Sequence, residues 1–546
     1  MFVRFHAALV LAAAPAAFAP AAHAQTSDAP DLAWVHVACP STEAVALTDA
    51  ARARRALRGS VATDTALDPA CRAALEHAGA TVRVESRWLS AYSVALPDAD
   101  VAARVAALPF VRSMEPVARL APQRRSTPEP RWPLLTAAPP TALAFALDYG
   151  ASRAQLDQIA VPAVHDQGFS GRGVVLGWLD TEYGDFVHPV FSAMVSEGRL
   201  KGTRLFTPGP QTNRHGLNTA SIAVGYAPGA LIGPGYGASL YAGVTEYAPT
   251  ETNAEEDAFV AGLEWLEAQG VDAVNVSLGY TTFDLGQRSY TYADLNGDRA
   301  VTTRAADAAA SRGVVVVASA GNDGCAAPSQ CWYYIGTPAD GDSVIAVGAT
   351  TLPSGTTPGG AKAGFSSFGP TADGRTKPDV SAPGAGVTIA TGASSYTTSS
   401  GTSFSAPLVT GVVALLLEAN PTLTPMQVRD VLRQTASQAS APDNRLGWGI
   451  VNAAAALTLA RTVDVAHDAA APALRLVVAG NASAAPTLVL DRAASVVVAD
   501  LLGRTLRREA ASTRIDLDGL APGVYTYVAT PDGGAPLRGS VVVTAR

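Results

Sequence analysis

SGTSFSAP, residues 400–407, is the most informative segment of this chain, because it leads from a glycine-containing turn into an apolar run at 408–417. It predicts a helix that carries Ser403 in its first turn. The first N–H groups of a helix have no partner within it, and that end of the helix dipole is positive. A serine there becomes a nucleophile only if a base takes its proton and donors hold the oxyanion. Without such partners the segment would be an ordinary helix cap.

Candidates for an acid and a base lie upstream, in the order acid, base, nucleophile. GVVLGWLD, residues 173–180, reads as a buried strand that ends in the carboxylate of Asp180. Functional sites assemble at the carboxyl edge of an open α/β sheet, which is where this carboxylate would lie. Of the eight histidines, only His215 opens a helix-like stretch that contains a glycine, in RHGLNTA at 214–220. We therefore expect Asp180 and His215 to act with Ser403.

A fourth element is GVVVVASAGNDG, residues 313–324, an apolar run that predicts a strand followed by Asn322. An asparagine amide there, together with the Ser403 backbone N–H, is suited to donate to a developing oxyanion. An Asn-Asp-Gly run alone would only indicate a turn. With Asp180, His215 and Ser403 in this chain order, the set resembles the catalytic site of the subtilisin-type (subtilase) serine proteases.

Further motifs carry the resemblance from about residue 147 to 456. FSSFGP at 365–370 and KPDVSAPG at 377–384 match the family's connection between the oxyanion strand and the nucleophile. NVSLG at 275–279 looks like the strand that pairs with the substrate backbone. The resemblance implies two walls of the first specificity pocket, formed by Ser277, Leu278 and Gly279 on one side and Ser319, Ala320 and Gly321 on the other.

The fold class follows from apolar strands that alternate with helical stretches across 147–462. This alternation predicts a parallel α/β sheet with helices on both faces, of the subtilisin-like kind. One departure from the family is Leu217, which stands where Ser or Thr usually follows His-Gly. The related sedolisins use Glu and Asp in place of histidine, but His215 and the flanking motifs argue against them. The alternative from another class is a catalytically degenerate subtilase that acts as a surface binding or adhesion protein.

The N-terminus reads as a secretory signal over residues 1–24. A basic start is followed by an apolar stretch at 7–19 and a small-x-small cleavage site, Ala22-His23-Ala24. No later run reaches 18 uninterrupted apolar residues, so no transmembrane segment is expected. The net charge is −8 and no long basic run is present, which gives a nucleic-acid partner no support. We expect a secreted or cell-surface protein.

Residues 25–120 are expected to form a propeptide, a small α/β module that inhibits the enzyme intramolecularly and assists its folding. An unrelated N-terminal binding domain is the alternative. Prolines and an Arg-Arg pair mark 121–146 as an exposed linker, where maturation cleavage is expected. The peptidase domain is expected at 147–462, followed by a second linker at 463–474.

Residues 475–546 change in character. Short strand candidates at regular spacing predict an all-β sandwich. LLGR at 501–504, GLAPGVY at 519–525 and the basic end at Arg546 resemble the C-terminal sorting domains of the type-nine secretion system, which would make secretion machinery a partner. A passive β-sandwich or a carbohydrate-binding module is the alternative.

Four cysteines fit an exported protein. Four cysteines allow three pairings, and proximity in sequence favours Cys325–Cys331, which leaves Cys39–Cys71. Neither pair has Cys-x-x-Cys spacing, so a metal site at the cysteines is a poor alternative.

The resemblance implies protein or peptide substrates and no cofactor for catalysis, and leaves structural calcium open. Asp294, Asn296 and Asp298 space three oxygen ligands at alternate positions, as calcium loops do. The glycine falls two places too early for an EF-hand and no glutamate follows at the twelfth position, so a polar turn is favoured.

Overall fold

The computed structural model describes residues 31–117 and 147–463, apart from positions 44, 61, 63, 208–212, 286 and 355–358. In the C-terminal tail it describes five strands and some adjoining residues. The chain divides into two compact units, Met1–Ala460 and Arg461–Arg546. The expected signal segment 1–24 and the expected linkers, apart from Val463, lie outside the described residues.

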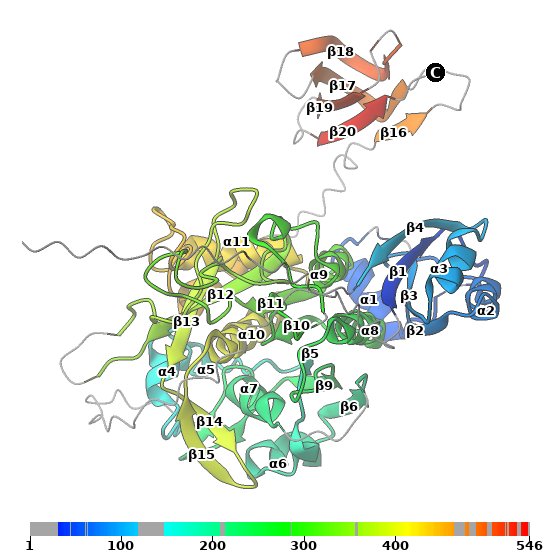
Figure 1. The fold of residues 1–546 in the computed structure, drawn as a ribbon. Helices are drawn as coiled ribbons and strands as arrows, with labels where there is room; N and C mark the ends of the chain where they lie inside the picture. The colour runs from blue at the N-terminus through cyan, green and yellow to red at the C-terminus, as the bar shows by residue number, and fades with distance from the viewer. Residues whose placement is uncertain are drawn as a thin grey trace, which may run out of the picture. The chain divides into compact units, whose positions relative to one another are not determined.

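A seven-stranded parallel sheet in the order β13-β12-β11-β10-β5-β9-β6 forms the centre of the first unit (Figure 1). Most of its strands are apolar along their whole length, as expected where both faces of a parallel sheet are covered. The strands are β5 (Val175–Asp180), β6 (Leu200–Leu205), β9 (Ser239–Val244), β10 (Ala273–Val276), β11 (Val315–Ser319), β12 (Val344–Thr351) and β13 (Val380–Ala385).

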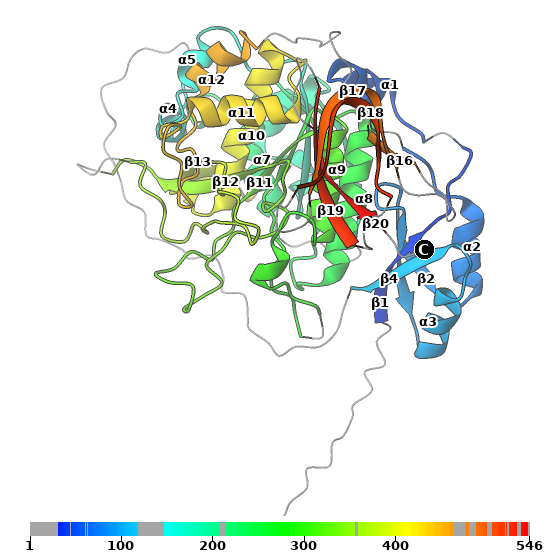
Figure 2. The same cartoon turned by 90° about the horizontal axis from the view of Figure 1, so that it is seen from above.

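Helices cover both faces of this sheet (Figures 1 and 2). Successive residues of a strand point to opposite faces. A Cβ atom on Gly177 would lie 2.8 Å from Leu266 in α8, whereas Trp178 Nε1 donates to Thr219 in α7 at 3.0 Å. The predicted parallel sheet between two helical layers is therefore confirmed. The helices in contact with the sheet are α7 (His215–Val224), α8 (Asn253–Gln269), α9 (Val301–Ser311), α10 (Thr402–Ala419) and α11 (Pro425–Thr435).

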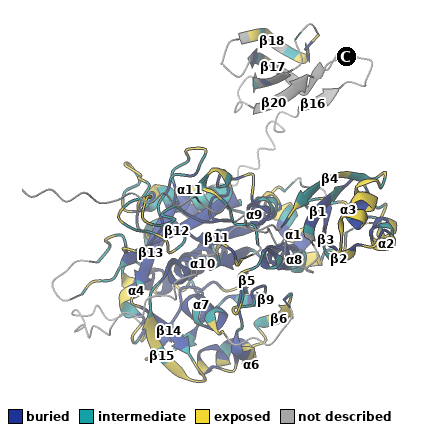
Figure 3. Cartoon of the chain, in the orientation of Figure 1, coloured by how far each residue is buried: buried dark blue, intermediate teal, exposed yellow. Residues whose placement is uncertain are grey.

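Shorter elements complete the domain, and the buried interior follows α10 and the central strands (Figure 3). Within the described part of the chain, α10 alone is long and apolar enough to cross a membrane, but 89% of its window is buried, as in any core helix. The shorter elements are α4 (Arg153–Asp157), α5 (Pro162–His165), α6 (Ser192–Ser196), α12 (Ala453–Ala460), β7 (Tyr226–Ala227), β8 (Leu231–Ile232), β14 (Val387–Thr391) and β15 (Ser395–Ser399).

Residues 31–117 form a separate α/β module, which packs on α8 (Figure 1). Its antiparallel sheet has the order β2-β3-β1-β4. The elements are β1 (Asp31–Val37), α1 (Asp49–Leu57), α2 (Pro69–His77), β2 (Thr81–Ser86), β3 (Ala91–Leu96), α3 (Ala99–Ala106) and β4 (Val111–Pro116). Asp98 caps α3, because its side chain accepts from Val101 N at 2.8 Å. The small α/β module expected at the N-terminus is confirmed.

The sheet of this module is buried on both faces. Val35 and Tyr92 belong to a core shared with α2 and α3, whereas Trp34 and Ala91 belong to the cluster that contains Phe259 of α8. This alternation has the period of two that a strand requires. The module therefore uses one face of its sheet for its own core and the other for packing on α8 of the larger domain.

The second unit is an all-β module. Five strands form one antiparallel sheet around the long strand β17. The first residues of β17 pair with β16, its last residues pair with β19, and β18 pairs with both parts of β17. Strand β20 pairs with β19. Its described core includes Val496, Val498 and Ile515. The strands are β16 (Leu476–Ala479), β17 (Thr487–Ala499), β18 (Thr505–Asp516), β19 (Gly523–Pro531) and β20 (Leu537–Val543).

Candidate active site

Asp180 is the last residue of β5, at the carboxyl edge of the sheet, and it is fully buried. Three donors hold its carboxylate. His215 Nδ1 and Thr181 N each lie 2.7 Å from Oδ1, and Thr219 Oγ1 lies 2.9 Å from Oδ2. Because a carboxylate oxygen only accepts, the histidine proton is assigned to Nδ1, which leaves Nε2 free of a proton.

His215 opens α7, and local contacts fix its position. Its backbone N–H donates to Asn213 Oδ1 at 2.9 Å. The next residue must be glycine, since a Cβ atom on Gly216 would lie 2.7 Å from the Thr181 carbonyl oxygen. Leu217, the departure from the family pattern, is fully buried, so it belongs to the interior of the domain.

Ser403 is the second residue of α10 and is 7% exposed. Its N–H belongs to the first turn, whose N–H groups point out of the helix. The His215 ring lies beside Phe404, the residue after Ser403, with ring centroids 5.7 Å apart. The Ser403 carbonyl oxygen accepts from Ser277 Oγ at 2.8 Å, which ties the start of α10 to the end of β10.

Asn322 follows β11 and contacts the first turn of α10. Its side-chain oxygen accepts from Thr402 N at 2.8 Å and from Thr402 Oγ1 at 2.9 Å. With the oxygen held in this way, the amide NH₂ points away from Thr402. Thr402 and Thr219 were not singled out from the sequence, although both orient members of the site.

The two expected pocket walls lie at the ends of neighbouring strands, and Ser319 Oγ joins them by donating to the Leu278 carbonyl oxygen at 3.3 Å. The Ser277 side chain faces inward, since Asn275 Nδ2 donates to its hydroxyl at 2.9 Å and the residue is 3% exposed. Leu278 is half-buried, Gly279 is exposed and Ala320 is fully buried.

Gly321 is required by its backbone. Its φ is +111°, in the left-handed region, and a Cβ atom there would lie 2.8 Å from Ser367 Oγ. Its N–H donates to Thr402 Oγ1 at 3.1 Å, so this wall is also joined to the first turn of α10.

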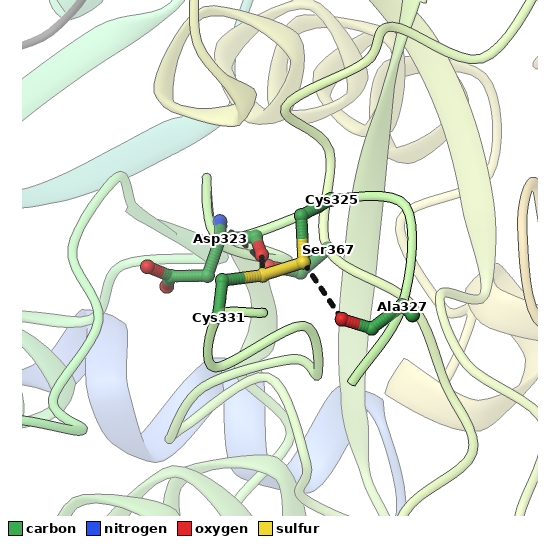
Figure 4. Close-up of a disulfide and its surroundings, with 5 residues drawn as sticks. All are labelled: Asp323, Cys325, Ala327, Cys331 and Ser367. Carbon is green, nitrogen blue, oxygen red and sulfur yellow. Dashed lines mark hydrogen bonds between the residues drawn. A yellow bond between two sulfur atoms is a disulfide. The ribbon is translucent and has the colours of Figure 1, made fainter. Parts of the chain in front are cut away.

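Both predicted disulfides are present, Cys39–Cys71 and Cys325–Cys331. The second lies beside Asp323, the residue after Asn322 in the sequence, and Figure 4 shows it with Asp323, Ala327 and Ser367. The Cys331 sulfur lies 2.7 Å from the Asp323 carbonyl oxygen, and Asp323 N donates to Ser367 Oγ at 3.1 Å. A disulfide sulfur carries no hydrogen, so the sulfur contact is close packing rather than a hydrogen bond.

The three candidate calcium ligands belong to a polar turn. Asp294 accepts from Thr291 N at 2.8 Å and Thr291 Oγ1 at 2.7 Å, and Asn296 Oδ1 accepts from Asp298 N at 3.1 Å. Across the part of the chain that the structure describes, no three His, Cys, Asp or Glu side chains are placed to hold a metal ion.

Comparison with known proteins agrees with this geometry. Residues 171–449 match the model of the subtilase family, and residues 35–130 match that of the peptidase S8 propeptide domain of Bacteroidota. An alkaline protease of Alkalihalobacillus alcalophilus is 31% identical over 321 residues, 58% of this chain and 71% of that protein. Subtilisin Savinase of Lederbergia lenta is 31% identical over 306 residues, 55% of this chain and 97% of that protein.

A solved structure shows the same fold. Fervidolysin from Fervidobacterium pennivorans aligns with a TM-score of 0.55 and 20% sequence identity over 95% of this chain and 77% of that chain. The fold and the relatives define a serine-type endopeptidase with an N-terminal propeptide. The chain belongs to the subtilase family.

Proposed function

We propose that Ser403, His215 and Asp180 form the catalytic triad of a secreted endopeptidase. The hydrogen bond of 2.7 Å between Asp180 Oδ1 and His215 Nδ1 is the observation that carries the proposal. Because the Nδ1 proton of His215 is held by Asp180, the unprotonated Nε2 of His215 is available as the base. Ser403 Oγ attacks the substrate carbonyl carbon, and His215 takes the hydroxyl proton and returns it to the leaving amine. Water then hydrolyses the acyl-enzyme by the same route.

The oxyanion of each tetrahedral intermediate is held by the Asn322 amide and the Ser403 N–H. The orientation of Asn322, with its oxygen on Thr402, supports this role. These donors act at the positive end of α10, where developing negative charge is favoured.

The main chain at Ser277, Leu278 and Gly279 is proposed to pair with an extended peptide, and Ser319, Ala320 and Gly321 to form the opposite wall of the first pocket. The inward hydroxyl of Ser277 supports a positioning role for that side chain, with only its backbone toward substrate. Exposed Gly279 leaves the wall open to a substrate side chain.

Each remaining segment of the chain has a proposed role in the export or maturation of this endopeptidase. Residues 1–24 direct export, the propeptide 25–120 blocks the cleft, maturation cuts the linker 121–146, and the peptidase domain spans 147–462. After the linker 463–474, the module at 475–546 serves as a sorting domain for secretion, supported by its separate β-sheet core. Substrates are proteins or peptides.

Replacing Ser403 by alanine tests the proposal. We expect the Ser403→Ala precursor to keep its N-terminal region, to lose hydrolysis and to resist a fluorophosphonate probe. Ser405→Ala is the matched control, because Ser405 lies in the same helix and its hydroxyl has no hydrogen-bond partner among the described residues. Normal processing of the Ser403 variant, seen by mass spectrometry, would exclude self-maturation. Probe labelling of that variant would exclude Ser403 as the nucleophile, whereas failure of the probe to label the unchanged protein would favour a degenerate, binding role.

A further inference from the structure

Helix α1 takes no part in the core of the propeptide module. Among the described residues, that core comes from the sheet, α2, α3 and their connections, whereas the buried residues of α1 are Ala51 and Arg54. The helix packs against α8 of the peptidase domain instead (Figure 1). Gly270, which follows α8, makes room for it, since a Cβ atom there would lie 2.7 Å from Ala50 Cβ. We call residues 48–60 the arm of the propeptide.

Arg58 at the end of α1 binds main-chain oxygens of the peptidase domain. Its Nη1 donates to the carbonyl oxygens of Gly313 at 2.6 Å and Asp272 at 3.0 Å, and its Nε donates to that of Pro421 at 3.2 Å. The side chain is 1% exposed, and Nη2 completes the set on Asp272 Oδ1 at 2.8 Å. One guanidinium therefore joins the segments after α8, α9 and α10.

The arm also covers the carboxyl end of α8. Arg54 Nη1 donates to the carbonyl oxygens of Val271 at 2.8 Å and Glu267 at 3.3 Å, and Thr48 Oγ1 donates to that of Ala268 at 2.9 Å. The last carbonyl groups of a helix have no partner within it, and that end of the dipole is negative. A guanidinium group donates hydrogen bonds to these carbonyl oxygens and places a positive charge at the negative end of the dipole.

Buried carboxylates complete the contact. The side chain of Glu267 is 0% exposed and accepts from Arg54, Arg55 and Arg87 of the propeptide. In a further ion pair the carboxylate belongs to the propeptide, because Asp64 accepts from Arg312 of the peptidase domain. Removing one partner of a buried ion pair is costly, because it leaves the other charge unpaired away from water.

The arm binds the edge of the sheet opposite to the catalytic residues. Asp272 and Gly313 lie just before β10 and β11, at the amino edge. Asp180 ends β5, and Asn322 follows β11, at the carboxyl edge. Strands of this length place the two edges roughly 15 Å apart. The arm therefore contacts the peptidase domain at a place away from the catalytic residues.

We propose that the arm is an anchor that keeps the propeptide on the peptidase domain after the chain has been cut. The proposal deepens the inhibitory role given above and rests on the proposed cut in the linker. Cutting removes the covalent connection but no contact of the arm, so these contacts contribute to how tightly the cut propeptide stays bound. Release requires the buried arginines to leave their carbonyl and carboxylate partners.

The test uses the full-length Ser403→Ala precursor with a recognition site for a site-specific protease placed in the linker. After cutting, serial dilution and size-exclusion chromatography give the Kd of the propeptide fragment. We expect Arg54→Gln/Arg58→Gln to raise this Kd by roughly 100-fold or more. Arg52→Gln is the matched control, because Arg52 lies on the same helix and, among the described residues, donates its hydrogen bonds to Asp49 and Leu47 of the propeptide itself. The Kd of this variant should stay within about twofold of that of the unchanged fragment.

A double variant whose Kd stays within about threefold of that of the Arg52 control would overturn the proposal. Arg58→Lys keeps the charge and the stem but not the fork of donors, and it serves if the double variant does not fold; we expect about a tenfold rise in Kd. An unchanged Kd for Arg58→Lys in that case would also count against the anchor. Because the readout is binding and the linker is cut by an added protease, the result does not depend on whether Ser403 is the nucleophile.

Discussion

The oxyanion assignment belongs to a single side chain, Asn322, whose orientation depends on Thr402. We expect Asn322→Ala to lower kcat by about 10²–10³, the loss known for such a donor in subtilisin itself, with little change in KM. The donor acts mainly in the transition state, which is why binding of substrate should not change. Steady-state kinetics on a peptide substrate measure both constants, with Thr402→Ser as a control that keeps the hydroxyl. A kcat equal to that of the unchanged enzyme would reject the assignment.

At this scale the sequence was most informative where the chemistry demands a particular residue. Asp180 and His215 were expected to meet, and they do, at 2.7 Å. The hydrogen bonds of Ser277 and Thr219 were not predictable, because a serine or threonine in a motif can turn its hydroxyl inward or outward. Packing with residues distant in sequence decides that direction, as Asn275 does for Ser277.

Among the elements, the loop after β11 depends on its disulfide. We expect Cys325→Ser/Cys331→Ser to lower the free energy of unfolding by roughly 2 kcal/mol, since the closed loop is short. The kcat should also fall, but less than in Asn322→Ala, because the loop keeps its bond from Asp323 N to Ser367 Oγ. Thermal unfolding and kinetics of the mature enzyme test both points. The Cys39–Cys71 bridge lies in the propeptide, so its removal should leave the kcat of the mature enzyme unchanged.

The face of α8 under the propeptide is expected to make propeptide binding depend on pH. Burial raises the pKa of Asp257 to about 6, although Arg83 and Ser93 bind its carboxylate. Release exposes the group and returns its pKa toward the usual value near 3.8. The bound form then holds the proton more tightly, so binding strengthens as pH falls below about 6 and weakens as pH rises through it.

The Kd of the cut Ser403→Ala complex should accordingly rise by roughly tenfold between about pH 5 and about pH 8. Burial also raises the pKa of Glu264, which adds to the effect in the same direction. Asp257→Asn should reduce the slope without changing its sign. A Kd that falls with rising pH would contradict the burial argument.

Helices and strands with a clear apolar pattern were predictable, and the helix expected to carry Ser403 in its first turn is α10, Thr402–Ala419. Helix α1 was not located, because the apolar residues of its sequence DAARARRAL are alanines apart from Leu57, which give only a weak apolar pattern. Its buried residue Arg54 faces carbonyl oxygens of another part of the chain, and such a partner leaves no local pattern. In the tail, where short strands were expected, β17 is one long strand of 13 residues, Thr487–Ala499.

For the whole molecule, the division into two units separates catalysis from the tail. We expect deletion of residues 475–546 to leave the activity of the purified enzyme within about twofold, because all proposed site residues lie in Met1–Ala460. The truncated protein should accumulate within the cell envelope of its host. Fractionation and a peptidase assay measure the two effects. A large loss of intrinsic activity would show that the tail belongs to the catalytic fold.

The carbonyl oxygens that receive the arm also affect how this protein tolerates mutation. A substitution at Ala268, Val271 or Pro421 changes a side chain but leaves the main-chain oxygen in place. Few point mutations in the peptidase domain can therefore remove these bonds, whereas one base change in an arginine codon of the arm removes several. The contacts to main-chain oxygens are therefore encoded mainly by the propeptide, whereas the contacts of Glu267, Asp272 and Arg312 depend on side chains of the peptidase domain.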